Sequence, residues 1–536
     1  MTEYSWLLGI PILLPFIGAA LTLLLSRFHR TQRAIAVVIL ATVLAAAVAI
    51  TYQSVSGPLV LEVGGWAAPV GITLVADKLS ALMLTVSVFV TLCVMIYSSS
   101  QSFENDRVPI AVYNPTFLIL SAGVSNAFLT GDLFNLYVGF EILLVASFVL
   151  IMLGGTRDRL RSGTVYVVVS LVSSAIFLIA IAMIYAATGT VNMAQLAIRL
   201  PQIDQGAAQL AQVMLLIAFG VKAAVFPLSA WLPDSYPTAP APVTAVFAGL
   251  LTKVGIYAII RTQTTLFADS TLNPWLQAVA AATMIIGILG AVAQNDIKRV
   301  LSFTLVSHIG FMLWGVSIGT VDSLTAAVFY TAHHIMVQTS LFLVSGLMET
   351  VGGSTSLVEL GGLLKKWPLL AVLYLIPALN LAGVPPFSGF LGKIGLIEAA
   401  NRNGGMADYF MITVAITTSI LTLYALIRAW NMAFWQPLEN ESEEAEQSRP
   451  DVPKTMTGAT ILLITATLAL TFFAGPIYRF AAAGAAELRS PQIYVRAVLP
   501  EGERGTGTSK TEHGRGPQPT VTQTAPLATP TPGGGR

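Results

Sequence analysis

About fourteen apolar segments, each long enough to cross a lipid bilayer as a helix of roughly 20 residues, recur along this chain of 536 residues. Only 10% of the residues are charged and 55% are hydrophobic, whereas a soluble domain carries about 25% charged residues. Because backbone groups inside lipid must be satisfied within the segment, helices are the expected form. We therefore expect an all-α polytopic membrane protein with spans near 5–26, 34–52, 79–98, 110–130, 132–153, 163–187, 207–232, 241–262, 272–293, 300–319, 323–348, 368–400, 409–435 and 456–480.

The composition also excludes several function classes. A formal net charge of +1 gives no basis for binding nucleic acid, and the single Cys93 excludes an internal disulfide and a cysteine-based metal cluster. The sequence contains no phosphate-binding loop, dinucleotide fingerprint or metal-ligand cluster, so we expect no cofactor and no metal. The N-terminal MTEYSW lacks the basic region of a signal peptide, so we expect the first span to be retained.

The distribution of basic residues predicts the orientation of the spans. Cytoplasmic loops carry an excess of Lys and Arg. In this chain the basic residues concentrate in odd-numbered connections, so we expect those to face the cytoplasm and both termini to lie outside. The residues concerned are Arg27, Arg30, Arg33, Arg157, Arg159, Arg161, Lys298, Arg299, Lys365 and Lys366.

Residues 217–253 combine buried charge with interrupted helix. Lys222 and Lys253 lie in apolar sequence, where each charge costs about 2.5–3.5 kcal/mol on insertion scales. Between them stand five prolines, which break or kink helices: Pro227, Pro233, Pro237, Pro240 and Pro242. A broken helix beside buried charge is tolerated only against protein or a hydrated cavity. The combination indicates an ion path.

A second break resembles the first. Residues 223–232 align with 382–391, a separation of 159 residues or about five spans, with five of ten positions identical, and the second copy contains Pro385 and Pro386. An odd number of spans inverts the second copy, as in transporters that place their sites on paired discontinuous helices. The alternative is that membrane helices rich in Pro and Gly simply look alike.

These observations divide the chain into six parts. We expect discontinuous seventh and twelfth helices, one in each of two inverted five-helix repeats. The parts are a three-helix segment at 1–109, the first repeat at 110–265, the second at 266–436, an acidic cytoplasmic loop at 437–455, the last span with its flank at 456–500, and a disordered Gly-, Thr- and Pro-rich tail at 501–536.

Few ionisable residues lie within the spans. Glu141 lies in the fifth span with Tyr137 one turn before it, on the same face. It is either part of an ion path or a structural partner for a lysine. Lys222 lies before the first break, too central to reach an interface, whereas Lys393 follows the second break and is less clearly central.

The remaining candidates are three histidines and one aspartate. A lone membrane histidine is usually a satisfied core residue, but His333 and His334 are adjacent, and His308 is a third at membrane depth. Asp234 lies in the broken segment and is either part of the ion path or a cap of a half-helix. Burial favours the neutral form of such groups and an opposite charge favours the charged form. Making and breaking a Glu–Lys contact is therefore a way to move a proton.

At these residues the sequence resembles a known family, the antiporter-like membrane subunits. The family comprises proton-pumping subunits of complex I, subunits of membrane-bound hydrogenases, and Mrp-type multisubunit cation/proton antiporters. The resemblance covers roughly residues 75–435 and rests on Glu141, Lys222, Lys253, His334 and Lys393. The run LPDSYPTAPAPVTAVFAGLLTKVGIYAIIR looks most like the D-type subunit of the Mrp antiporter. Where complex I relatives can carry a lysine, this chain has Gln338.

The resemblance implies a secondary transporter subunit and not an enzyme. It implies Na+/H+ exchange in a bacterial cell membrane, driven by inward protons, within a hetero-oligomeric complex. The implied proton relay runs Glu141, Lys222, Lys253, His334, Lys393, with Na+ the expected cation. Two alternatives stay open: a proton-pumping subunit of an NADH-quinone oxidoreductase or membrane-bound hydrogenase, and a structural membrane subunit without its own ion path.

Overall fold

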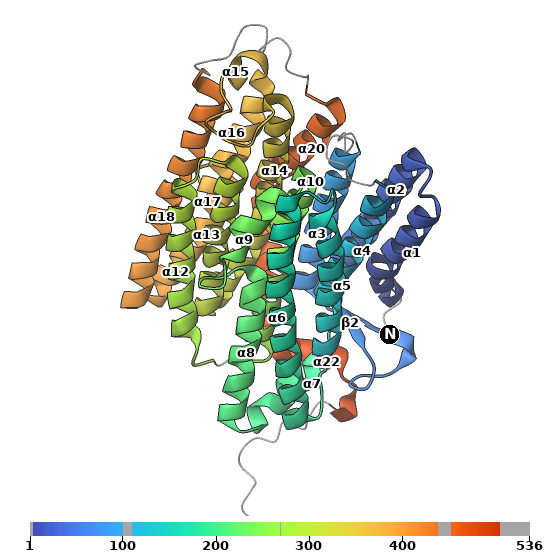
Figure 1. The fold of residues 1–536 in the computed structure, drawn as a ribbon. Coiled ribbons are helices and arrows are strands. Elements are labelled where there is room, and N and C mark those ends of the chain that lie inside the picture. The colour runs from blue at the N-terminus through green and yellow to red at the C-terminus, as the bar shows by residue number, and fades with distance from the viewer. Residues whose placement is uncertain (1–3, 100–109, 269, 438–451, 504–536) are drawn as a thin grey trace, which may run out of the picture.

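The computed structural model describes residues 4–99, 110–268, 270–437 and 452–503 as one bundle of helices with a small β-hairpin (Figure 1). The bundle has an α7 end, near α7 and α22, and an α15 end opposite. The elements are α1 (Ile10–Leu24), α2 (His29–Ser54), β1 (Leu59–Glu62), β2 (Thr73–Ala76), α3 (Lys78–Ser98), α4 (Ile110–Leu129), α5 (Leu133–Met152), α6 (Arg157–Thr188), α7 (Met193–Arg199), α8 (Gln205–Ala223), α9 (Trp231–Ser235), α10 (Ala241–Val246), α11 (Thr252–Thr265), α12 (Asn273–Val292), α13 (Ile297–Ile318), α14 (Val321–Gly352), α15 (Leu363–Lys366), α16 (Pro368–Ala382), α17 (Ser388–Asn403), α18 (Met406–Trp430), α20 (Lys454–Phe472), α21 (Ala474–Leu488) and α22 (Pro491–Val498).

The helices agree with a polytopic membrane protein. Within the described residues, twelve helices are long and apolar enough to cross a membrane. The two remaining predicted spans coincide with α4 and with the pair α16 and α17, which a break separates. The count of fourteen spans stays a prediction.

Both predicted breaks are present, and they share one backbone conformation. Helix α8 ends at Ala223 and α16 ends at Ala382, and each is followed by a left-handed residue, Ala224 at φ 58° and Gly383 at φ 87°. The hydrogen bond from Val225 N to Gly220 O recurs from Val384 N to Leu379 O, and the bond from Leu228 N to Val225 O recurs from Phe387 N to Val384 O. Each partner in the second set lies 159 residues after its counterpart.

The chain continues differently after the two breaks. Helix α17 begins at Ser388 and has 16 residues, whereas α9 has only five and leads through α10 and a π-helical turn at Phe247–Leu251 into α11. Pro227, Pro385 and Pro386 lie in the irregular segments, as predicted. Pro233 does not break a helix. It lies in the first turn of α9, where its missing N–H costs nothing.

Several features were not predicted from the sequence. The antiparallel hairpin pairs Leu59–Glu62 with Thr73–Ala76. The last span, expected at 456–480, ends at Phe472, and α21 and α22 follow it. Most of the predicted acidic loop at 437–455 and of the tail at 501–536 lies outside the described residues.

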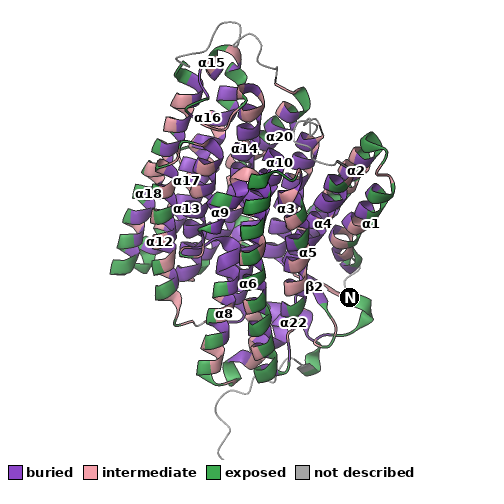
Figure 2. Ribbon diagram, viewed as in Figure 1, coloured by how far each residue is buried: buried purple, intermediate pink, exposed green. Residues whose placement is uncertain are grey.

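The most buried helices lie at the centre of the bundle (Figure 2). Helix α14 packs against α3, α10, α13, α16, α17, α20 and α21. The most apolar stretch of Ala241–Thr265 is 100% buried, whereas that of α6 is 39% buried. The central helices therefore contact only protein, and the peripheral ones present apolar faces suited to lipid or to other subunits.

Candidate functional site

The four basic members of the predicted relay all lie inside the protein. Lys253 and His334 are 0% exposed, Lys393 is 6% and Lys222 is 7% exposed. None of these side chains faces lipid. Such groups are expensive at membrane depth and are retained where they partner one another or serve an ion path.

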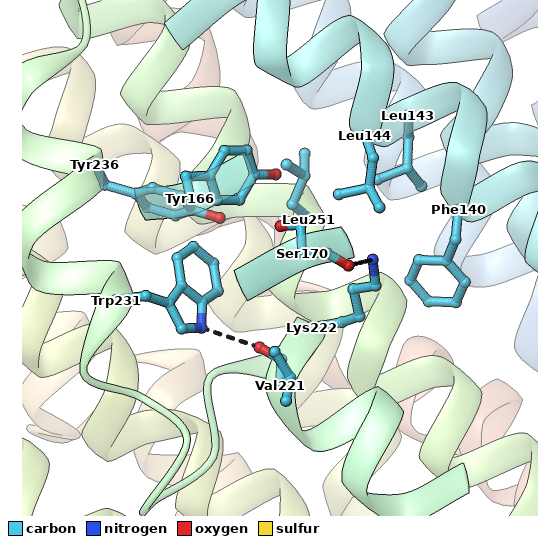
Figure 3. A pocket seen from close by; sticks show the side chains of 10 residues that line it. All are labelled: Phe140, Leu143, Leu144, Tyr166, Ser170, Val221, Lys222, Trp231, Tyr236 and Leu251. Atoms are coloured by element: carbon cyan, nitrogen blue, oxygen red, sulfur yellow. Dashed lines mark hydrogen bonds between the residues drawn. The ribbon is translucent and has the colours of Figure 1, made fainter. Parts of the chain in front are cut away.

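Lys222 lies in the last turn of α8 and reaches toward α6. Its Nζ donates to the Ser174 hydroxyl at 3.0 Å and to the Ser170 carbonyl at 3.2 Å. Beside it is a cavity with about 10 Å³ of space for the centre of a water molecule, lined also by Tyr166 and Trp231 (Figure 3). That volume is close to the minimum for a single water. The ammonium therefore has room for roughly one water beside it.

Glu141 on α5 follows Phe140, whose ring centroid lies 5.7 Å from the Lys222 Nζ. The carboxylate is half-buried, its Oε1 has no hydrogen-bond partner, and it interacts electrostatically with Lys222. No ion pair within 4.0 Å joins the two side chains, both of which lie in the described part of the chain. The Glu141 carboxylate thus acts on the Lys222 ammonium electrostatically, over a distance greater than 4.0 Å.

Tyr137 lies one turn before Glu141 and is half-buried. Its ring packs edge-on against Phe177 at 5.9 Å between centroids. It stays a secondary candidate beside the carboxylate.

Lys253 lies two residues after the π-helical turn in the most buried stretch. Its Nζ donates to the Ala248 carbonyl at 2.6 Å. π-Helical turns often mark functional sites because they misalign backbone carbonyls with the helical ladder. The end of α8 packs close by, since a Cβ placed on Gly255 would lie 2.8 Å from the Ala223 nitrogen. Lys253 therefore stands between the first break and the helices of the second half.

Three histidines and a tyrosine form one cluster between α13 and α14. His308 Nδ1 is hydrogen-bonded to the Tyr330 hydroxyl at 2.5 Å, and the ring centroids of His308 and His334 are 5.3 Å apart. The Tyr330 and His333 centroids are 5.4 Å apart. Both ring nitrogens of His334 lack a hydrogen-bond partner and are buried. In the neutral ring one of these nitrogens accepts a proton, so the cluster holds an acceptor that no group in the described part of the chain satisfies.

The cluster continues to the second break. His333 Nδ1 is 3.0 Å from the Ser388 hydroxyl, which in turn donates to Asn380 Oδ1 at 3.3 Å. Lys393 folds back toward α16, and its Nζ donates to the carbonyls of Ala382 at 2.9 Å and Leu381 at 3.2 Å. An ammonium at the C-terminal end of a helix meets unsatisfied carbonyls and the negative end of the helix dipole.

The arrangement places exchangeable groups in three sets. Glu141 and Lys222 form the first and Lys253 the second, and the third runs from His334 to Lys393. Groups of this kind, bridged by water, can pass protons along a chain. The geometry places Lys222 and Lys393 each beside a helix break.

One predicted candidate is not in the site. Asp234 lies in α9 and forms an exposed ion pair with Arg299 at 2.9 Å, with side-chain exposures of 69% and 38%. It neither caps a half-helix nor points toward the lysines. An exposed pair of this kind contributes little to stability.

Two features were missed from the sequence. Tyr330 lies one turn before His333 and His334, and this spacing was the available signal. Arg261 lies in α11 and forms a buried bidentate pair with Asp77 at 2.6 Å and 2.8 Å. Burial alone would raise the pKa of Asp77, but the charge and hydrogen bonds of Arg261 outweigh burial and lower it. Beside them, Lys78 pairs with Glu487 of α21.

Comparisons with known proteins agree with this architecture. The family described as NADH:quinone oxidoreductase/Mrp antiporter, TM, matches residues 130–422. The D-type subunit of the Na(+)/H(+) antiporter of Alkalihalophilus pseudofirmus is 40% identical over 92% of this chain and 99% of that protein.

Solved structures are similar over nearly the whole chain. A chain of the Mrp complex from Dietzia sp. DQ12-45-1b has a TM-score of 0.84 and 34% identity, covering 93% of this chain and 100% of that one. A chain of the membrane-bound sulfane sulfur reductase, an archaeal respiratory membrane complex, has a TM-score of 0.84 and 26% identity, covering 92% and 99%.

Proposed function

The chain belongs to the NADH:quinone oxidoreductase/Mrp antiporter membrane family, and from this premise we propose that it is the D-type subunit of a multisubunit Na+/H+ antiporter. The observation that carries the proposal is the buried set from Lys222 to Lys393, which lies between two helix breaks of the same conformation. In this role the chain carries protons, and the complex expels a monovalent cation, most simply Na+.

The proton route is Glu141, Lys222, Lys253, His334 and Lys393. His308, Tyr330 and His333 supplement it between His334 and the second break, because His308 contacts Tyr330 and His333 contacts Ser388. A membrane potential of 100 mV supplies about 2.3 kcal/mol per charge. That biases a relay of titratable groups, but it does not carry a bare proton through dry protein, so water must bridge the three sets.

In the proposed route the two inverted halves open to opposite sides of the membrane. Helices α8 and α16 approach their breaks from opposite ends of the bundle (Figure 1). One half then exchanges protons with the outside and the other with the cytoplasm. The loop charges support an orientation with both termini of this chain outside, and the bacterial relatives support a cell membrane as the location of the complex.

The second candidate is a proton-pumping subunit of a respiratory complex. It is favoured by the likeness to the archaeal sulfane sulfur reductase. The higher identity to D-type antiporter subunits favours the first proposal, and transport fits the buried site better than an enzymatic role does. A structural subunit without its own ion path is disfavoured because all the central charges are present and buried.

The decisive experiment measures proton flux in vesicles containing the purified assembly. We expect an inward proton gradient to drive cation movement, and an added Na+ gradient to drive proton movement in return. Flux that is independent of every monovalent cation, together with co-purifying flavin or iron–sulfur subunits, would favour the respiratory role instead.

A further inference from the structure

Two adjoining cavities open near the α7 end of the bundle: the first, called the polar cavity, is lined by polar side chains together with apolar ones, and the second is apolar. The polar cavity measures about 630 Å³ and the apolar one about 490 Å³. Both fall in the range of about 300–1,000 Å³ typical of ligand pockets. Neither contains a member of the proposed proton relay.

Neighbouring residues of the same two chain segments line both cavities. On α8, Gln209 and Gln212 line the polar cavity and the next residue, Val213, begins the apolar one. Before α12, Thr271 lines the polar cavity and the next residue, Leu272, lines the apolar one. Along these two segments, the polar side chains of the first cavity therefore give way to an apolar lining at one level in the bundle.

The apolar cavity lies against the first helix break. Apolar side chains and glycine line it: on α8 they extend from Val213 through Ile217 to Gly220, and beyond the break they include Phe226 and Leu228. Val279 of α12 closes the other side. Val213 is exposed and Ile217 is 39% exposed, so the cavity opens on the lipid-facing side of the bundle.

The length of the site matches one leaflet of a bilayer. Gln209 and Gly220 are eleven residues apart on α8, which is about 16 Å at roughly 1.5 Å per residue. Half of a hydrocarbon core about 30 Å thick is about 15 Å. Trp275, 73% exposed, lies in the first turn of α12 beside the polar–apolar boundary. Tryptophan concentrates at the membrane–water interface.

The polar cavity supplies hydrogen bonds and a positive charge. Gln212 Nε2 donates at 2.6 Å to both Gln263 Oε1 and Ser270 Oγ, so a linked set of polar groups lies beside this cavity. Arg489 also lines it, is exposed, and donates to the Ala268 carbonyl at 3.3 Å. Guanidinium groups bind phosphate through planar, bidentate hydrogen bonds.

We propose that this double cavity is a binding site for an anionic phospholipid. The phosphate headgroup lies in the polar cavity against Arg489, and an acyl chain lies in the apolar cavity between α8 and α12. A lipid is the occupant that matches a site apolar at one end and polar and cationic at the other. The bound chain contacts the break at Phe226, whose backbone N–H donates to Thr283 Oγ1 of α12 at 3.1 Å.

The test uses the intact purified complex in nanodiscs of phosphatidylcholine. A trace of phosphatidylglycerol with a photoactivatable acyl chain is cross-linked, and the labelled peptides are mapped by mass spectrometry. Labelling is expected on the α8 and α12 peptides that line the apolar cavity. Ile217→Trp fills that cavity and should reduce this labelling at least about five-fold.

The matched control is Ile286→Trp on α12. Ile286 is 44% exposed, close to the 39% of Ile217, and does not line either cavity. It should leave the labelling unchanged. Equal labelling in the two variants would overturn the site, as would cross-linking of a neighbouring polypeptide's helix to these same peptides.

The headgroup is tested separately with Arg489→Gln. One basic residue at a membrane surface is worth about 1 kcal/mol, or about five-fold, in attraction to anionic lipid. The variant should lower the preference for phosphatidylglycerol over a phosphatidylcholine probe by about that factor. Arg479→Gln, at an exposed arginine of α21 outside both cavities, is the control. An unchanged preference in Arg489→Gln would refute the phosphate contact.

Discussion

Replacing Lys222 by Met should abolish most of the proton flux of the assembled complex while leaving the complex intact. The substitution keeps an unbranched, largely apolar side chain of similar length. It removes the ammonium that donates to Ser170 and Ser174. It also leaves Glu141 without the positive charge with which it interacts.

The magnitude follows from the surroundings of Lys222. The adjacent cavity has about 10 Å³ of space for water centres, enough for roughly one water and too little for a water chain to replace the lost group. Without the amine, a passing proton has no base to hold its charge at this depth, and an unsupported charge at membrane depth costs about 2.5–3.5 kcal/mol. Because about 1.36 kcal/mol is a tenfold change in rate, the flux should fall about 70- to 370-fold.

The effect on stability should be small by comparison. Each lost hydrogen bond of the ammonium is worth about 1.5–3 kcal/mol, but the variant no longer buries a charge, and the two effects oppose each other. The assembled complex should therefore be recovered in normal yield. This separates loss of transport from loss of folding.

The assay is Na+-dependent proton uptake in vesicles containing the purified complex. Lys454→Met is the matched control, because it removes an exposed lysine at the start of α20. It should transport normally. Flux in Lys222→Met above about a tenth of the wild-type value would refute the role of Lys222, given that the expected loss is nearer 100-fold.

Four further predictions concern Lys393, Tyr330, Asp77 and the chain without its partner subunits. Lys393→Met should reduce flux as strongly as Lys222→Met, and normal flux in vesicles would remove Lys393 from the route. Tyr330→Phe leaves His308 Nδ1 without its hydrogen bond, so the thermal midpoint should fall in keeping with a loss of about 1–3 kcal/mol; an unchanged midpoint would show that the bond is dispensable. The lowered pKa of Asp77 gives stability that is complete above the ordinary pKa near 3.8 and is lost as pH falls through the lowered pKa. Asp77→Asn should cost about 3–5 kcal/mol of stability at pH 7, because it leaves Arg261 unpaired. Equal thermal midpoints of variant and wild type at pH 7 would contradict this. The chain reconstituted alone should show no antiport, and robust Na+/H+ exchange by the isolated chain in liposomes would contradict the need for partners.

The positions of the spans could be predicted because a helix that crosses a bilayer needs roughly 20 consecutive apolar residues. The span expected at 79–98 is α3 at Lys78–Ser98, and that expected at 272–293 is α12 at Asn273–Val292. The C-terminal end of the last span was predicted less well. Residues 473–480 are apolar enough to extend the preceding span, yet α20 ends at Phe472 and α21 begins a separate helix at Ala474.

The lysines of the site could also be predicted, since an unneeded charge at membrane depth is too costly to be incidental. Tyr330 was missed although it lies one turn before the histidine pair, because a tyrosine in an apolar helix is ordinary core sequence until its neighbours are known. Asp77 and Arg261 are 184 residues apart, and only tertiary packing brings them into contact. Each of the two lies near the end of a span, where a charged side chain is ordinarily solvated, so their sequence positions do not indicate that they pair.

The two breaks share a backbone conformation, but they do not place their lysines equivalently. With a separation of 159 residues, Lys222 aligns with Leu381 and Lys393 aligns with Asp234. Lys222 precedes its break and donates to α6, whereas Lys393 follows its break and folds back on the last carbonyls of α16. The short α9 carries Asp234 to the surface, where it pairs with Arg299, while the 16-residue α17 keeps Lys393 inside. The two halves therefore cannot be interchangeable half-channels. In the first half the ammonium belongs to the helix that enters the break, and in the second it belongs to the helix that leaves it.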